Sequence, residues 1–149
     1  MKFTAIVPLK VNSERVPRKN FRLLGGKPLF AHIFETLLEV PLLDRIVCWS
    51  SDDFFKDLLP EGVEFIKRES YLDGNEIKAK ELFTEAAKQI DTDYFVLTHA
   101  TAPFIKATSI SKGINAILDG YDSSFTVKEM KNYCWFDNKT LNYSLDSPV

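Results

Sequence analysis

Short apolar segments recur along the chain, and most of them lack a regular alternation of polar and apolar residues. They are rich in β-branched and aromatic residues, which is typical of strands that are buried on both faces of a sheet. This pattern predicts five strands, over residues 3–7, 45–49, 63–66, 94–97 and 124–127.

The segments between these strands have helical spacing. Leu29, Ile33 and Leu37 fall on one face of a helix, and Pro28 suits its first turn because a missing N–H costs nothing there. A second, short helix is predicted over 52–59 and a third over about 75–90. A fourth begins near Thr108 or Ser109, either of which is a good N-cap. The tail after residue 128 is predicted to form a hairpin or loop.

Strands and helices thus alternate along the whole chain, which favours right-handed βαβ units and a mainly parallel sheet. The expected architecture is a three-layer αβα, Rossmann-like fold. The chain has 149 residues without an internal repeat or a linker, so we predict a single α/β domain over 1–149. A chain of this size can bury a core without disulfide or metal cross-links.

Composition excludes several classes of protein. Apolar residues make up 45% of the chain and charged residues 27%, which excludes a disordered or fibrous protein. A net charge of −2 argues against a generally basic nucleic-acid binder. No apolar run is long enough for a membrane span or a signal peptide. Cys48 and Cys134 are interpreted as free thiols of a cytoplasmic protein, with a single disulfide as the alternative.

A basic segment follows the first predicted strand directly. Between positions 10 and 22 it carries one anion, Glu14, and five cations: Lys10, Arg15, Arg18, Lys19 and Arg22. Its net charge is therefore +4, which leaves −2 − 4 = −6 for the remaining chain. Ligands of open α/β sheets bind beyond the carboxyl ends of the strands, so the segment is suited to a polyanion such as a nucleoside triphosphate. The alternative is a solvated surface.

Two common nucleotide-binding motifs are absent. Gly25-Gly26-Lys27 lacks the rest of a Walker-type phosphate loop, and no Gly-x-Gly-x-x-Gly sequence occurs. Asn12 and Ser13 form a short turn instead, whose backbone N–H groups can point toward an anion.

The segment Val7-Pro8-Leu9-Lys10-Val11-Asn12-Ser13-Glu14-Arg15-Val16-Pro17-Arg18-Lys19-Asn20, followed by Gly26-Lys27-Pro28-Leu29, resembles a known signature. It is similar to the amino-terminal motif of the acylneuraminate cytidylyltransferases and their relatives acting on 2-keto-3-deoxy sugars. Three weaker matches keep the family's order: Ser50-Ser51-Asp52-Asp53, Lys67-Arg68, and Val96 to Pro103. The resemblance implies a fold of the nucleotide-diphospho-sugar transferase type.

The resemblance also implies roles for single residues. Lys19 and Lys10 are the expected catalytic cations, which would stabilise charge at the α-phosphate of CTP. His99 and Thr101 match positions beside the sugar. The nucleotide-binding set implied by the family is Lys10, Asn12, Ser13, Arg15, Lys19, Asn20 and Arg68.

The implied reaction joins CTP to an acidic 2-keto sugar, giving the CMP-sugar and pyrophosphate. The resemblance implies Mg²⁺ as cofactor, held by paired aspartates in a later segment, so no metal ligand is predicted here. The dimerisation element of such enzymes also lies later, and a homodimer is one candidate assembly. The chain is therefore expected to be the amino-terminal part of a cytidylyltransferase domain, truncated at its carboxyl end.

Three positions depart from the family pattern and keep other interpretations open. Lys10 replaces the usual arginine, Glu14 a common lysine and His99 a glutamine. These departures favour a non-catalytic or incomplete nucleotide-binding module of the same fold. A third interpretation is a nucleotidyltransferase or glycosyltransferase with another base or acceptor, because a fold does not set the function by itself.

Overall fold

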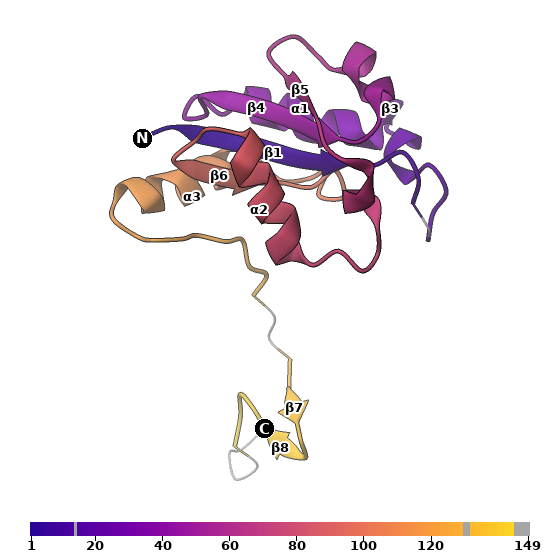
Figure 1. Cartoon of the computed structure of the whole chain (residues 1–149). Helices are drawn as coiled ribbons and strands as arrows, with labels where there is room; N and C mark the ends of the chain where they lie inside the picture. The colour runs from indigo at the N-terminus through magenta and orange to yellow at the C-terminus, as the bar shows by residue number, and fades with distance from the viewer. Residues whose placement is uncertain (14, 130–131, 145–149) are drawn as a thin grey trace.

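A computed structural model describes residues 1–13, 15–129 and 132–144 (Figure 1). Its central sheet consists of β1 (Phe3–Leu9), β4 (Arg45–Ser50), β5 (Glu64–Lys67) and β6 (Tyr94–Leu97). These strands are all parallel and lie in the order β5-β4-β1-β6. Their carboxyl ends therefore meet at one edge of the sheet.

Helices cover both faces of this sheet. Helices α1 (Leu29–Leu38) and α3 (Ala107–Leu118) pack on the face that contains Ala5 and Val7 of β1. Helix α2 (Ala79–Gln89) packs on the opposite face, where Ile6 lies. The prediction of a three-layer αβα fold with a mostly parallel sheet is thus confirmed.

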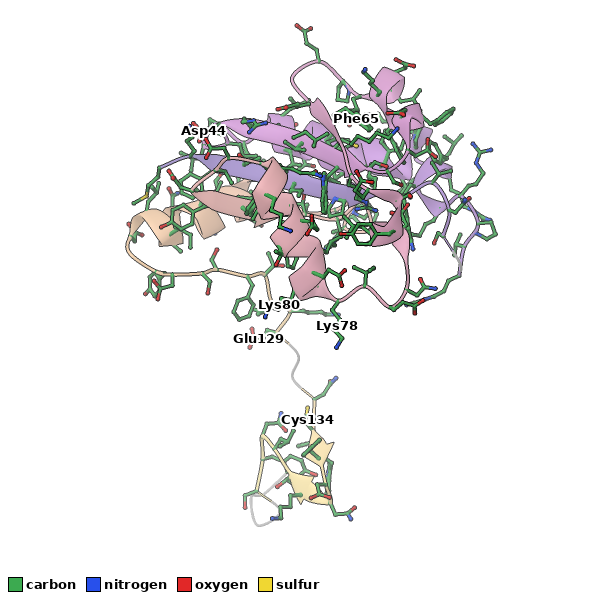
Figure 2. All side chains as sticks on the ribbon, viewed as in Figure 1. Asp44, Phe65, Lys78, Lys80, Glu129 and Cys134 are labelled. Atoms are coloured by element: carbon green, nitrogen blue, oxygen red, sulfur yellow. The ribbon has the colours of Figure 1, made fainter. Side chains whose placement is uncertain are left out.

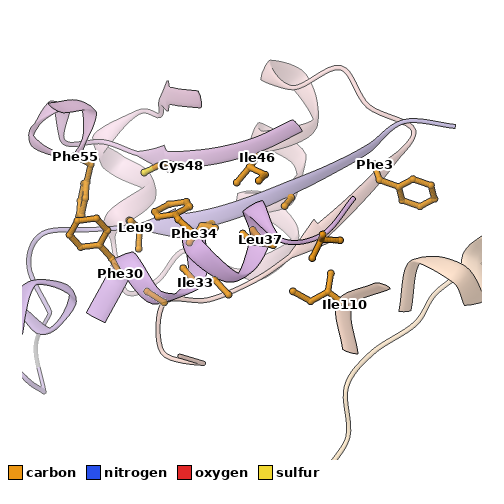
Figure 3. Packing of buried hydrophobic residues seen from close by; sticks show 14 of the residues in the cluster. Phe3, Leu9, Phe30, Ile33, Phe34, Leu37, Ile46, Cys48, Phe55 and Ile110 are labelled. Atoms are coloured by element: carbon orange, nitrogen blue, oxygen red, sulfur yellow. The ribbon is translucent and has the colours of Figure 1, made fainter. Parts of the chain in front are cut away.

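Strand β1 is central, and its side chains are buried on both faces, which accounts for the lack of polar alternation in its sequence. On the α1 face, Phe34 and Leu37 are fully buried against the sheet (Figure 3). Burial of each such side chain contributes about 1.5–3 kcal/mol. The end of the central strand β1 is therefore held by packed side chains on both faces of the sheet.

Several predicted elements have different bounds in the structure. Residues 53–58 form a 3₁₀ helix, η2 (Asp53–Leu58), and α2 begins at Ala79 rather than near residue 75. Helix α3 begins after Lys106, which caps it without a side-chain hydrogen bond, so the predicted Thr108 or Ser109 cap is wrong. Both residues lie inside the first turn, where they have helical backbone geometry.

The predicted strand over 124–127 is also wrong. These residues are exposed and pair with no strand in the described part of the chain. Their β-branched and aromatic side chains favour extended backbone, but β propensity alone does not supply a neighbouring strand.

Two short hairpins complete the structure. Strands β2 (Leu23–Leu24) and β3 (Lys27–Pro28) pair across Gly25 and Gly26, whose φ values of +59° and +84° suit a type I′ turn. Strands β7 (Trp135–Phe136) and β8 (Lys139–Thr140) confirm the hairpin predicted for the tail.

Both cysteines are free thiols, as predicted. Cys48 is buried in β4, whereas Cys134 is half-buried in the segment that leads into β7 (Figure 2). In the described ranges, no helix has the length and apolar character needed to cross a bilayer.

Candidate functional site

Two adjoining cavities lie at the carboxyl edge of the sheet. The larger has a volume of about 530 Å³ and lies between the segments that follow β1 and β4 and the residues from the end of η3 (Ser70–Asp73) to Glu76. The smaller measures about 210 Å³ and lies between the end of β1, η1 (Lys19–Phe21) and the loop after β6. Lys10 and Ser13 line both cavities, so the segment after β1 forms their common wall.

The smaller cavity coincides with the point at which the strand order reverses. The chain forms β1, adds β4 and β5 on one side of it, and then crosses to place β6 on the other side. Loops that leave β1 and β6 consequently diverge and leave a crevice between them. Ligands of open α/β sheets bind at this kind of crevice.

The structure brings six of the predicted site residues together in the lining of the smaller cavity. They come from three separate segments of the chain, and they are Lys10, Ser13, Lys19, Asn20, His99 and Thr101. Asn12 lines the larger cavity. Arg15 is exposed and Arg68 is buried, and neither belongs to the lining of either cavity.

The two cavities differ in charge. The larger is lined by the carboxylates Asp52, Asp73 and Glu76, with Lys10 as its cation. The smaller is lined by two lysines, Lys10 and Lys19, and by no carboxylate of a described residue. An anion such as a phosphate is therefore favoured in the smaller cavity, where cations face it without a competing acid.

The basic segment is held by its own backbone and by one amide side chain. Arg18 adopts the left-handed conformation, with φ at +50°, and its carbonyl accepts a hydrogen bond of 2.9 Å from the N–H of Phe21. Asn20 is buried, and its Nδ2 donates a hydrogen bond of 2.9 Å to the carbonyl oxygen of Lys10. A non-glycine residue with positive φ is uncommon and points to a conformation fixed by its surroundings.

An aromatic cluster anchors this segment to the body of the protein. The ring of Phe21 stacks on Phe55 at 5.1 Å between centroids and meets Phe30 and Phe54 edge-on at 5.6 and 5.4 Å. These partners belong to α1 and η2, so Phe21 fixes η1 between two separate elements. Lys19 therefore starts from an anchored piece of backbone.

Arg68 is buried and contacts a residue that lines the larger cavity, Asp73. One of its guanidinium nitrogens donates to Asp73 Oδ1 at 2.5 Å and to the carbonyl oxygen of Leu9 at 3.2 Å. Its guanidinium carbon lies 5.2 Å from the centroid of a Trp49 ring. Arg68 thus forms an ion pair with Asp73.

Burial raises the pKa of the nearby Cys48 thiol to about 12, although the charge of Arg68 acts in the opposite direction. A thiol with such a pKa stays protonated at neutral pH, which makes it a poor nucleophile and a poor metal ligand. Cys48 therefore belongs to the core beside the site and does not take part in its chemistry.

Over residues 4–146, the sequence matches the protein family described as Cytidylyltransferase. The chain belongs to this family. This membership agrees with the resemblance that the segment after β1 carries, and it covers nearly the whole length of the cytidylyltransferase chain.

The relatives of the chain include cytidylyltransferases that are named for different sugars. The chain is 25% identical over 134 residues to a 3-deoxy-manno-octulosonate cytidylyltransferase of Pelobacter propionicus, covering 89% of this chain and 50% of that protein. It is 28% identical over 116 residues to an N-acylneuraminate cytidylyltransferase of Escherichia coli, covering 76% of this chain and 27% of that protein. The cytidylyltransferase chain thus spans half or less of these relatives.

A solved structure shows the same fold. It is a CMP:2-keto-3-deoxy-manno-octonic acid synthetase complexed with CTP, which superposes with a TM-score of 0.69 at 19% identity. The alignment covers 80% of this chain and 48% of that one. The expected fold of the nucleotide-diphospho-sugar transferase type is therefore confirmed for this chain.

Asp52 has a structural role in the cytidylyltransferase chain. Its carboxylate accepts a hydrogen bond of 2.9 Å from the N–H of Phe54 and so caps η2. In the described ranges, no three His, Cys, Asp or Glu side chains gather in a way that could hold a metal ion. Mg²⁺ stays an expectation from the resemblance.

Sequence reasoning missed part of the larger cavity's lining. Asp73 ends η3, and Asn75 and Glu76 follow it; sequence reasoning gives these residues no role, because no strand precedes them directly. The signal that could have found them is the Asp-Gly-Asn-Glu sequence shortly after Arg68, since a buried arginine requires a nearby carboxylate.

Proposed function

We propose that this chain forms the CTP-binding part of an enzyme that activates an acidic 2-keto sugar of the sialic-acid type, a nonulosonic acid. The single observation that carries the proposal is the smaller cavity. It lies where the strand order reverses, and it brings together Lys10, Lys19, Ser13 and Asn20 with the loop after β6. In this proposal, the triphosphate of CTP occupies that cavity.

The proposed reaction is an in-line displacement at the α-phosphorus of CTP. The anomeric hydroxyl oxygen of the sugar forms a bond to this phosphorus while the bond to the bridging oxygen of the β-phosphate breaks. Pyrophosphate leaves with the bonding electron pair, and the hydroxyl proton passes to solvent. Catalysis of such a step requires mainly the alignment of the two reactants and the neutralisation of negative charge.

The lysines of the smaller cavity suit this requirement. Among the described residues, neither Lys10 nor Lys19 forms an ion pair. Lys10 Nζ donates to the uncharged backbone carbonyl of Asp73, and an incoming anion can replace this acceptor. Each close contact with a phosphate is worth about 4 kcal/mol of Coulomb energy at an effective dielectric of about 20, before desolvation is subtracted. Lys10 and Lys19 are therefore assigned to the phosphates.

His99 and Thr101 lie on the opposite side of the same cavity and are assigned to the sugar. This placement fits an acceptor that approaches the α-phosphate from the β6 side. Curated relatives of similar identity act on 3-deoxy-manno-octulosonate and on N-acylneuraminate. We favour the nonulosonic acid because the motif after β1 resembles the acylneuraminate enzymes in particular.

Calorimetry with CTP, UTP and ATP tests the nucleotide, and pyrophosphate release tests turnover. The release assay uses CTP, Mg²⁺ and a panel of N-acylneuraminate, a related nonulosonic acid and 3-deoxy-manno-octulosonate. Preferential CTP binding with release only on the nonulosonic acids supports the proposal. Pyrophosphate release only with 3-deoxy-manno-octulosonate would show that this sugar, and not a nonulosonic acid, is the substrate. CTP binding without pyrophosphate release would favour an incomplete nucleotide-binding module. Equal affinity for the three nucleotides would refute the assignment to a cytidylyltransferase site.

A further inference from the structure

Asp73 connects the ends of three neighbouring strands. Its carboxylate accepts one hydrogen bond from Arg68, which follows β5, and one from Ser51, which follows β4, both at 2.5 Å. Its backbone carbonyl accepts a hydrogen bond of 3.3 Å from Nζ of Lys10, which follows β1. Asp73 thus links the segments that follow β1, β4 and β5, and the first of these forms the common wall of the two cavities.

These contacts fix where the Lys10 ammonium lies. The Arg68 side chain is 4% exposed and also donates to the carbonyl oxygen of Leu9, so it joins η3 rigidly to the end of β1. The carbonyl of Asp73 is thereby set at a constant place relative to the Lys10 backbone. A long lysine side chain otherwise has many rotamers, and ordering it opposes any contact that it makes.

We propose that Asp73 is a positioning residue, which holds the Lys10 ammonium at the common wall so that it is presented to the phosphates of CTP. This inference rests on the proposed function for the identity of the anion. Asp73 touches no phosphate itself and acts through Lys10. The bond from the Nζ ammonium to the carbonyl is long, at 3.3 Å, and its acceptor is uncharged, so a charged phosphate oxygen in the neighbouring cavity can replace it.

A purely structural role for Asp73 is the competing hypothesis. Its carboxylate also compensates the buried charge of Arg68, and removing it would destabilise the fold whatever happens at Lys10. The two roles differ in one respect. A positioning role requires that the effect of Asp73 on CTP binding disappear when Lys10 is absent, whereas a structural role does not.

A double-mutant cycle tests this difference. CTP binding is measured by calorimetry for the unsubstituted chain, Asp73→Asn, Lys10→Met and the double variant, each first shown by thermal unfolding to be folded. Asp73→Asn is expected to weaken CTP binding about tenfold when Lys10 is present and less than about twofold when it is absent. An equal loss in both backgrounds would overturn the proposal.

Glu64→Gln is the matched control. Glu64 lies at the start of β5, and its carboxylate pairs with Arg45 at 2.7 Å. The variant therefore removes a carboxylate from another arginine pair, at a residue that lines neither cavity. Its CTP affinity is expected to equal that of the unsubstituted chain.

A second measurement does not depend on CTP. The rate of acetylation of Lys10 is measured by mass spectrometry relative to that of Lys19. The rate is expected to rise severalfold in Asp73→Asn, because the carboxylate no longer ties the accepting backbone carbonyl to Ser51 and Arg68, and an unchanged rate would overturn the proposal. If the unsubstituted chain binds no CTP while this rate still rises, the proposed function fails and the positioning of Lys10 by Asp73 is upheld.

Ser51→Ala serves if Asp73→Asn does not fold. It removes one hydrogen bond to the Asp73 carboxylate and leaves the ion pair with Arg68 in place. The acetylation rate of Lys10 is expected to rise by a smaller factor in this variant, and no rise would again overturn the proposal.

Discussion

Asn20 Nδ2 donates a hydrogen bond of 2.9 Å to the carbonyl oxygen of Lys10, and this contact closes the basic segment onto the strand that it leaves. Asn20 is only 6% exposed, so water has little access to the bond. The residue that follows Lys19 thus fixes the backbone of Lys10. The two cations of the smaller cavity are coupled through a single amide.

Substitution of Asn20 should destabilise the chain in a graded way. Asn20→Ala leaves the Lys10 carbonyl without its donor, which is expected to lower the free energy of unfolding by about 1–3 kcal/mol. Asn20→Asp should cost more, because it places a carboxylate oxygen against a carbonyl oxygen. Urea unfolding of the two variants measures this order, and an Asn20→Asp protein as stable as the unsubstituted one would contradict it.

Lys19→Ala is expected to weaken CTP binding by about tenfold or more, since it removes one charge contact from the smaller cavity. Lys56→Ala removes the same charge from η2, outside both cavity linings, and should leave the affinity unchanged. Calorimetry at two salt concentrations checks this, because the loss of a phosphate contact also lowers the salt dependence. Equal losses for the two variants would place the phosphates elsewhere.

Phe21→Ala should affect both stability and binding. It removes the ring that joins η1 to Phe30, Phe54 and Phe55, and the half-buried position predicts a loss of about 2–4 kcal/mol in the free energy of unfolding. CTP affinity should fall as well, since η1 carries Lys19. Phe21→Leu keeps much of the packing and is the control. Unchanged affinity in a folded Phe21→Ala protein would show that the aromatic anchor does not position η1.

The thiol of Cys48 predicts a specific dependence of stability on pH. Its pKa is about 12 in the folded chain against 9.0 for an unperturbed thiol, chiefly because of burial. Above pH 9 the unfolded chain loses this proton while the folded chain keeps it. The contribution of Cys48 to stability is therefore complete below pH 9 and declines as the pH rises toward 12.

Comparison with Cys48→Val isolates this effect. Between pH 8 and pH 10, the free energy of unfolding of the unsubstituted chain should fall by about 1 kcal/mol more than that of the variant. Chemical denaturation at the two pH values measures the difference. Parallel behaviour of the two proteins would mean that the thiol is not shielded from water as the structure shows.

The pattern of apolar residues was sufficient to predict the four strands of the central sheet. Strands such as β1 and β4 are buried on both faces, and a short, continuous apolar run rich in β-branched residues is typical of that position. Lys10, Lys19 and His99, which line the smaller cavity, were named from sequence because the motifs that contain them resemble those of a known family. Lys10 and His99 also lie just after the ends of β1 and β6, and strand ends converge in a parallel sheet.

Contacts between distant polar residues were not accessible in this way. Nothing in the local sequence of Arg68 shows that its charge is buried beside Trp49 or that Asp73 compensates it. The strand predicted over 124–127 failed for a related reason, because extended propensity does not specify a pairing neighbour. Both errors concern interactions whose partners are chosen by the tertiary fold.

The position of Lys10 on the common wall of the two cavities limits which substitutions the site can accept. Any replacement of Lys10 alters the linings of the larger, acidic cavity and the smaller, basic cavity together. A substitution of Lys10 that improves the fit of a ligand in one cavity would therefore also change the other cavity. Lys19 lines only the smaller of the two cavities and Glu76 only the larger, so a substitution of either residue changes one cavity alone.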